Sequence, residues 1–470
     1  AGSQPMDSVL NAEVGLQTSN NGRFVRLWHE VPVHGISFNS TSSEEAVDTR
    51  LRWFPYNKGG AYRKWYGNQE HVVNWHNNGE EIKAYVSAKY PYLKGNTDYV
   101  IKDRGWFFQP SVSWSDITSG ANSFRFYPQG FVFDVCGMSA FPTSETLGGL
   151  IATCNTNFLN VIVKSLNPTF HFQVGNFREL PFLEKAVNSQ EMGSLGIRLI
   201  REHEIDWNAY ERSWDFQSLP LLTASSEPTP TLESSYTAWI TQNKGTIAEM
   251  KRLEEENNRL FIDAYGLADE LTPDVPIEQI TLTVNPAYRY GGKLTEEEQW
   301  TRFRQDTMEE LVSYAIGCMM GRYSLDAPGL IYAHSGNEGF DPSQYTTFPA
   351  DDDGIVPLTD TEWFEDDACN RLVEFMSVAF PSDANKDHLQ ANLDFLADNL
   401  SPKRGESSRD TLRRYLSNSF YKDHMQTYKK RPIYWLFSSG KEKAFQCLVY
   451  LHRYNAGTLA RMRTEYVIPL

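Results

Sequence analysis

A change of pattern near residue 230 most constrains what this chain can fold into. Up to about residue 182, short runs of aromatic and β-branched residues alternate with Gly, Asn, Pro and Ser clusters, as strands and turns do. Beyond residue 231, apolar residues recur mostly at helical steps. The polar, proline-bearing stretch 223–231 separates the two patterns and is typical of an exposed connection between domains.

The two patterns predict an α+β fold. In the first half we expect strands and hairpins that include 24–28, 106–108, 124–127 and 131–133, with helices at 69–89 and 144–166. In the second half we expect a long helix at 231–266 that ends on Gly266, and further helices at 295–320, 366–380, 384–400, 409–420 and 441–466. The predicted organisation is a junction (1–30), a mixed α/β domain (31–222), a linker (223–233) and a mainly α-helical domain (234–470).

Charge and cysteine content limit the class of protein. The net charge of -16 would repel phosphate from a uniform surface, so any nucleic-acid site must be a local basic patch. Five scattered cysteines without a C-x-x-C pair predict buried free thiols rather than disulfides or a zinc site. With no membrane-length apolar run and no signal peptide, we expect a cytoplasmic protein without a membrane partner. Ala1-Gly2-Ser3 and the abrupt end at Leu470 suggest a piece cut from a longer protein.

The sequence contains no catalytic set that this chain could hold on its own. A methyltransferase that acts on an exocyclic amine needs a glycine-rich turn for its cofactor and an N-P-P-Y type loop for the base. The nearest string, Asn285-Pro286-Ala287-Tyr288, has Ala in place of the second Pro and no glycine turn upstream, so we predict an accidental turn. No phosphate-binding loop, metal-ligand spacing or nucleophile motif is present either.

A first cluster with chemistry suited to DNA spans residues 55–68. Its cations supply charge for phosphates or guanine edges, and its Tyr and Asn side chains suit stacking on a base and bonding to it. The candidate contact residues are Lys58, Arg63, Lys64, Tyr66 and Asn68. The alternative is an ordinary loop with a solvated basic face.

A second cluster spans residues 105–125 and combines small hydroxyl residues with aromatic ones. Ser can donate to or accept from base edges and phosphates, so the cluster suits groove contacts. Its candidates are Ser113, Trp114 and Arg125. The alternative is a serine-rich hairpin with no ligand.

A third cluster is a dense run of cations in the helical half, interleaved with Tyr and Trp. Because the chain as a whole is acidic, this run of cations indicates a separate positive surface, as proteins that contact the backbone of a DNA duplex have. The cations are Lys403, Arg404, Arg409, Arg413, Arg414, Lys422, Lys429, Lys430 and Arg431. The alternative is that they pair with the acidic loop at 351–367.

Five stretches carry a resemblance to a known family. They are Gly15–Val31, Lys58–Asn68, Leu166–Asn176 (LNPTFHFQVGN), Phe261–Pro273 (FIDAYGLADELTP) and Lys430–Phe437 (KRPIYWLF). With these, the chain resembles the BREX-type (PglX) adenine-specific DNA methyltransferases, phage-defence enzymes related to type IIG restriction-modification proteins. The resemblance covers nearly the whole chain after Gly15.

The resemblance implies a parent enzyme that transfers methyl from S-adenosylmethionine to N6 of adenine in a short DNA site. This chain would be its target-recognition domain and C-terminal helical domain, without the catalytic domain, so we expect no cofactor here and no methyl transfer by this chain alone. The candidates of the first two clusters would lie near the bases. Arg404, Arg409, Arg413, Arg414, Lys429, Lys430 and Arg431 would clamp the DNA backbone. Implied partners are double-stranded DNA, the missing methyltransferase domain, other BREX proteins and acidic phage proteins that imitate DNA.

Two other function classes stay open. The helical half could be a scaffold that binds defence proteins without touching DNA. A carbohydrate-active protein would also be acidic and rich in Trp and Tyr, but it needs two carboxylates at a set separation, and the acids here cluster in a loop.

Overall fold

The computed structural model describes residues 4–8, 10–103, 105–117, 121–166, 171–382 and 386–469. Part of the Leu166–Asn176 string, residues 167–170, and residues 118–120 of the second cluster thus lie outside the described residues. The chain forms two compact units: unit 1 comprises 1–31, 35–207 and 245–291, and unit 2 comprises 32–34, 208–244 and 292–470. The division falls inside helix α10 (Leu232–Tyr265). The domain boundaries given above stay predictions.

Unit 1 contains two four-stranded sheets. The first has the order β3-β5-β4-β8, with β4 and β8 parallel and the other pairs antiparallel. The second has the order β2-β9-β6-β7 and is antiparallel. A short pair, β1 (Gln4–Pro5) with β10 (Pro181–Phe182), completes the strands described in this unit. The strand bounds in the two larger sheets are β2 Asn11–Glu13, β3 Val25–Leu27, β4 Trp53–Asn57, β5 His71–Asn74, β6 Ser111–Ser113, β7 Arg125–Tyr127, β8 Val132–Phe133 and β9 Ser139–Phe141.

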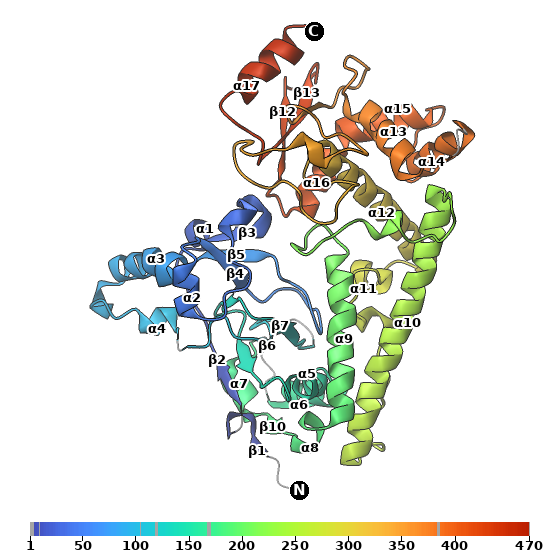
Figure 1. The fold of residues 1–470 in the computed structure, drawn as a ribbon. Helices are drawn as coiled ribbons and strands as arrows, with labels where there is room; N and C mark the ends of the chain where they lie inside the picture. Colours follow the sequence, from blue (N-terminus) through green and yellow to red (C-terminus); the bar gives the residue numbers. More distant parts are fainter. Residues whose placement is uncertain are drawn as a thin grey trace. The chain divides into compact units, whose positions relative to one another are not determined.

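Helices surround these sheets. In Figure 1, α9 runs beside the second half of α10, and Arg198 of α9 pairs there with Glu249 of α10 at 2.8 Å. The bounds are α1 Asn21–Phe24, α2 Ser43–Asp48, α3 His76–Lys89, α4 Asp98–Ile101, α5 Leu147–Cys154, α6 Asn157–Leu166, α7 Val174–Glu179, α8 Glu184–Val187, α9 Gln190–Asn208 and α11 Pro286–Tyr290.

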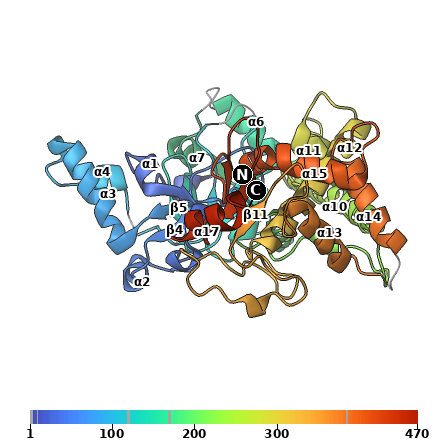
Figure 2. The same cartoon turned by 90° about the horizontal axis from the view of Figure 1, so that it is seen from above.

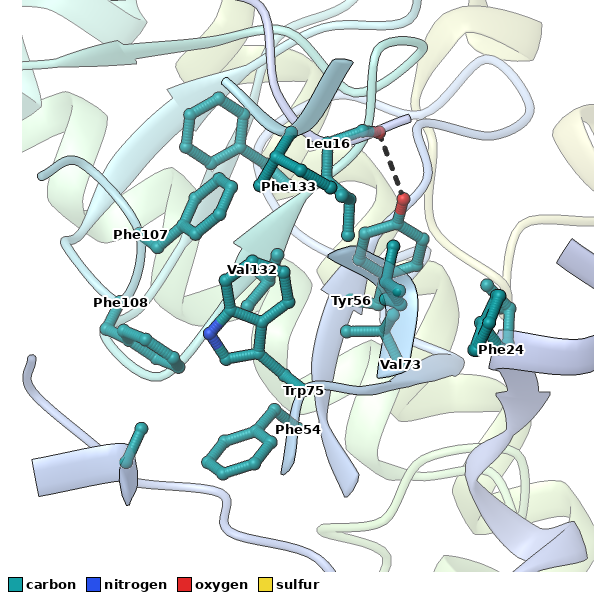
Figure 3. Packing of buried hydrophobic residues seen from close by; sticks show 14 of the residues in the cluster. Leu16, Phe24, Phe54, Tyr56, Val73, Trp75, Phe107, Phe108, Val132 and Phe133 are labelled. Carbon is teal, nitrogen blue, oxygen red and sulfur yellow. Dashed lines mark hydrogen bonds between the residues drawn. The ribbon is translucent and has the colours of Figure 1, made fainter. Parts of the chain in front are cut away.

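An aromatic core fills the space between the first sheet and the segments around it. Figure 3 shows Trp75, Phe107 and Phe133 packed together, and ring centroids 5.2 Å apart at nearly perpendicular angles join Phe107 to each of the other two. Such edge-to-face contacts are favourable beyond the area that they bury. The buried Tyr56 hydroxyl donates to Asp134 Oδ2 at 2.6 Å and lies 3.2 Å from the Leu16 carbonyl oxygen, so its polar end is satisfied.

Unit 2 is mainly helical. Helices α13, α14 and α15 pack against one another, as Figures 1 and 2 show. A three-stranded antiparallel sheet, β11-β13-β12, accompanies the helices. The bounds are α12 Glu296–Met319, β11 Ile355–Pro357, α13 Ala368–Ala379, α14 Lys386–Asp398, α15 Ser408–Asn418, α16 Phe420–Thr427, β12 Tyr434–Ser438, β13 Gln446–Tyr450 and α17 Thr458–Arg461, followed by a π-helical turn at Met462–Val467.

The α+β fold class is confirmed, and the long helices match their local signals. Helix α10 spans Leu232–Tyr265 and is followed by Gly266 at φ +67°, as predicted. Helix α12 begins after Thr295, whose hydroxyl accepts from the Glu298 N–H, and ends before Gly321 at φ +74°. Ser407 caps α15 in the same way.

Several predicted elements were wrong. The helix predicted at 441–466 is replaced over Gln446–Tyr450 by strand β13, because a strand buried on both faces lacks the alternation that marks a strand in sequence. The runs at 124–127 and 131–133 do not form a hairpin, since β7 and β8 belong to different sheets. Residues 106–108 form no strand, with a turn at 107–108, and the helix predicted from 69 begins only at His76, after strand β5.

The helix predicted at 144–166 is broken into α5 and α6 at Asn155. The Asn155 amide accepts from the Phe124 N–H and donates to the Phe124 carbonyl, both at 3.0 Å, as a neighbouring strand would. A side chain that bonds a distant backbone in this way competes with helix continuation.

The structure also bears on the predictions about membrane-spanning segments and cysteines. No helix among the described residues is long and apolar enough to span a membrane. All five cysteines are free thiols, but Cys136 is exposed whereas the sequence predicted burial of all of them.

Candidate nucleic-acid interface

The first two polar clusters, far apart in sequence, meet in unit 1. The first is the β4–β5 loop of one sheet, and the second is the β6–β7 loop of the other. The Gly60 N–H donates to Ser115 Oγ at 3.0 Å, and the Ser115 hydroxyl is 2.9 Å from the Gly60 carbonyl. Trp65 bonds through its backbone to Phe124 and Phe126, each at 2.8 Å, like an extra strand residue beside β7. The two loops therefore form one continuous surface.

Arg125 braces the two loops from inside. Its side chain is fully buried, and Nη1 donates to the Arg63 carbonyl at 3.0 Å while Nη2 donates to Ser115 Oγ at 3.0 Å. Because a guanidinium offers several donors in a fixed plane, one Arg side chain can bond a backbone carbonyl of the first loop and a side-chain hydroxyl of the second. This side chain is internal, and not at the surface where the sequence placed it.

Arg63 is also buried, with 2% of its surface exposed. Its guanidinium lies 3.3 Å from Asp206 Oδ2 on α9 and 5.1 Å from the centroid of the Trp207 ring, and it donates to the Thr283 hydroxyl. The Asp206 carboxylate in turn accepts from the backbone N–H groups of residues 283 and 284. Arg63 thus ties the first loop to α9 and to the segment before α11.

Lys64 makes a second internal tie, to α10. Its ammonium pairs with Glu254, whose other oxygen accepts from the Trp65 indole N–H at 2.9 Å. Burial by itself lowers the pKa of Lys64, but the Glu254 carboxylate and the Tyr62 hydroxyl outweigh it, so this pKa stands above its ordinary value. Lys64 is charged and satisfied inside the protein.

The other candidates in unit 1 divide by exposure. Tyr66, Ser113 and Trp114 are buried, with hydrogen bonds to Gln69 Oε1, the Met138 carbonyl and the Phe172 carbonyl respectively. Lys58 is a quarter exposed and lies 3.5 Å from Asp134 Oδ2. Asn68 is half-buried and donates to the Ala61 carbonyl at 2.9 Å.

Six of the eight residues expected near the DNA therefore have internal side chains in this structure, and this corrects their predicted placement. They are Arg63, Lys64, Tyr66, Ser113, Trp114 and Arg125. The sequence predicted that both clusters lie near one recognition face, and in the structure hydrogen bonds join the two loops. It gave no sign of Asp206 and Glu254, the buried acids that hold the first loop, because these lie 143 and 190 positions from their partners.

A cavity of about 410 Å³ opens on the joined loops. Residues of both loops line it together with the short 3₁₀ turn Ile277–Gln279. We call it the loop cavity. Its lining includes Gly60, Tyr62, Ile117, Asn122, Glu278 and Gln279.

In unit 2 the cations of the third cluster differ in exposure. Arg413 Nη1 lies 2.6 Å from Asp367, so the alternative of pairing with the acidic loop holds for this residue. Arg414 pairs with Glu406 at 2.7 Å, outside that loop. The candidates with exposed side chains are Arg404, Arg409, Lys429, Lys430 and Arg431, together with Lys403 and Lys422.

The string Asn285–Tyr288 does not fit a methyltransferase base-binding loop. Asn285 caps α11, and its side-chain amide donates to the carbonyls of Ile277 and Ile280, both at 2.8 Å. The Asn285 side chain is thus bonded inside unit 1, and the string begins helix α11, whereas the sequence predicted an accidental turn. No three His, Cys, Asp or Glu side chains of the described residues are grouped as metal ligands would be.

No family model matches the chain. It is 40% identical over 469 residues to the adenine-specific methyltransferase BrxX of Escherichia coli O9:H4 (strain HS), with 97% of this chain and 36% of the relative aligned. It is 39% identical over 476 residues to the adenine-specific methyltransferase PglX of Lacticaseibacillus casei (strain Zhang), with 99% and 36% aligned. The resemblance predicted from the sequence is confirmed: over nearly its whole length, the chain is similar to a portion, about a third, of the adenine-specific methyltransferases BrxX and PglX.

Proposed function

We propose that this chain is the C-terminal portion of an adenine-specific methyltransferase of a BREX phage-defence system. Its role there is to recognise double-stranded DNA. The observation that carries the proposal is the union of two polar, aromatic-rich loops into one surface, in a chain similar to a third of BrxX and PglX. Methyl transfer, and the binding of S-adenosylmethionine, belong to the part of the protein outside this chain.

The recognition surface consists of the two joined loops of unit 1. Lys58 and Asn68 are the earlier candidates that keep partly exposed side chains for direct contact. The buried Arg63, Lys64 and Arg125 act as positioning residues, because base edges are read only by groups held in a fixed register. Their buried charges fix the conformation of the first loop, and exposed groups of that loop contact the DNA.

Backbone contact falls to the exposed cations of unit 2. Arg404, Arg409, Lys429, Lys430 and Arg431 are the residues predicted to clamp the backbone whose side chains are exposed. Neutralising phosphates releases counterions, so these residues supply affinity that depends on salt and carries no sequence information. Arg413 and Arg414 are excluded from this role by their carboxylate partners.

The proposal is tested by selecting duplexes from a random library with the purified chain. The expected result is a short motif, with binding that weakens steeply as salt is raised. Mapping methylated adenines in cells with and without the gene should return the same motif. A chain that retains no duplex at low salt, or retains duplexes without any motif, contradicts the proposal and favours a protein-binding scaffold.

A further inference from the structure

The loop cavity differs from the rest of the proposed recognition surface in its chemistry. Its described lining contains one carboxylate, Glu278, and neither Lys nor Arg. A cavity with this lining repels phosphate, so it is unsuited to the DNA backbone. Its volume, about 410 Å³, falls within the range of cavities that take small organic groups.

Three side chains that line the cavity carry an amide or a carboxylate group. The hydroxyls of Ser115 and Ser123 are already bonded to the loop backbone and to Arg125. By contrast, the side chains of Asn122, Glu278 and Gln279 make no hydrogen bond or ion pair to any described residue. The cavity therefore presents two amides and one carboxylate to a ligand.

An aromatic ring, an apolar side chain and two small residues surround these polar groups. Tyr62 contributes a half-buried ring, and Ile117 an apolar side chain that is 62% exposed. Gly60, at φ +144°, and Ala61 form an exposed rim of small residues. Such a lining suits the edge of an aromatic heterocycle.

The walls are held in place from both sides. The turn that carries Glu278 and Gln279 is fixed by the Asn285 amide, which bonds the carbonyls of Ile277 and Ile280. The Lys64 N–H donates to the Thr281 hydroxyl at 3.0 Å, which links this turn to the first loop. Groups held in this way are preorganised and lose little freedom on binding.

We infer that the loop cavity reads a base that carries an exocyclic amine, adenine or cytosine, through its major-groove edge; the inference rests on the proposed function. Carboxylates and amides accept hydrogen bonds from the N4 amine of cytosine or the N6 amine of adenine, and an amide also donates to adenine N7. Guanine and thymine present O6 and O4 instead, which would face the Glu278 carboxylate with like partial charge. The carboxylate thus selects by repulsion as well as by attraction.

The experiment repeats the duplex selection with Glu278→Gln and with Gln279→Ala. The wild-type chain is expected to restrict one motif position to adenine or cytosine. Glu278→Gln replaces an exposed acceptor by an amide that also donates, so guanine or thymine should enter at that position while the rest of the motif is unchanged. Glu270→Gln, an exposed acid elsewhere in unit 1, is the matched control and should select the wild-type motif.

A second measurement removes the amine from the DNA. Replacing the base at that position by its analogue without the amine, purine for adenine, should weaken wild-type binding roughly 5- to 100-fold. The loss should be smaller in Glu278→Gln. If both variants select the wild-type motif and the analogue binds as well as the natural base, the cavity inference is overturned and DNA recognition stands. If the wild-type chain selects no motif, the proposed function fails, and the cavity inference with it.

Discussion

Lys64 and Glu254, 190 residues apart in the chain, form an ion pair with side chains only 5% and 3% exposed. The pair joins a loop between two strands to the second half of α10, the longest helix described. A buried pair of this kind is weak evidence of net stabilisation, but losing one partner leaves an uncompensated charge inside the protein. This asymmetry makes the pair a good probe of how the loop is held.

Glu254→Ala should therefore lower the free energy of unfolding by about 3–5 kcal/mol in urea denaturation. The double variant Lys64→Met/Glu254→Met, which buries no charge, should recover much of that loss. Glu256→Ala on the same helix is the control, because its pair with Arg252 is exposed and is expected to contribute less than about 1 kcal/mol. Equal losses in Glu254→Ala and Glu256→Ala would show that the buried pair does not hold the loop.

The exposed and paired cations of unit 2 should behave differently in DNA binding. Combining Arg404→Ala, Arg409→Ala and Lys430→Ala should flatten the dependence of log affinity on log salt, by up to about 0.9 for each phosphate that is no longer neutralised. Arg413→Ala should leave this slope unchanged, because its charge is already paired with Asp367. Fluorescence anisotropy over a salt series measures both slopes, and the reverse pattern would exclude these residues from binding the DNA backbone.

His203 should make unit 1 sensitive to acid. Burial, together with the charges of Arg63 and Lys64, lowers its pKa to about 3 against about 6.5 in an unfolded chain. The unfolded state thus takes up the proton first, so the stability contribution is complete above about pH 6.5 and declines as the pH falls towards 3, by about 1.4 kcal/mol per pH unit. His203→Gln should reduce this slope in denaturation curves taken between pH 4 and 7. The exposed His76→Gln should not.

Glu211 should make unit 2 less stable as the pH rises, which is opposite to the effect of His203 in unit 1. Burial raises its pKa to about 7, even though the Tyr428 hydroxyl donates to it at 2.7 Å and Arg322 favours its charged form. A raised carboxyl pKa means that stability is present below about pH 4.5 and is lost as the pH rises to 7, by at most about 3 kcal/mol.

Glu211→Gln keeps an acceptor oxygen for Tyr428 and removes the titration. Its free energy of unfolding should exceed that of the wild type at pH 8 and match it near pH 4.5. Glu365→Gln, at an exposed position of the same unit, serves as the control. A difference between Glu211→Gln and wild type that stays constant with pH would contradict the assignment.

Local signals accounted for much of the fold. The caps at Thr295 and Ser407 and the glycine after Tyr265 marked helix ends correctly, because a cap is an interaction among residues a few positions apart. The strand at Gln446–Tyr450 was missed, since burial on both faces depends on what packs there, which no local pattern records.

The candidate site shows the same division. Sequence identified the two loops and the resemblance to adenine-specific methyltransferases, but it placed Arg63, Lys64 and Arg125 at the surface because isolated cations in a loop are usually solvated. The acids that bury them, Asp206 and Glu254, lie on helices far along the chain.

By itself, then, the sequence determined which segments become helices with clear ends, which loops carry polar and aromatic side chains, and which proteins the chain is similar to. Only the tertiary structure decided which charges point inward, and so which residues hold the loops and which are left to meet a ligand. The physical reason is that charge burial is a property of two partners in contact, and chain folding brings together residues whose separation in sequence carries no trace of the pairing.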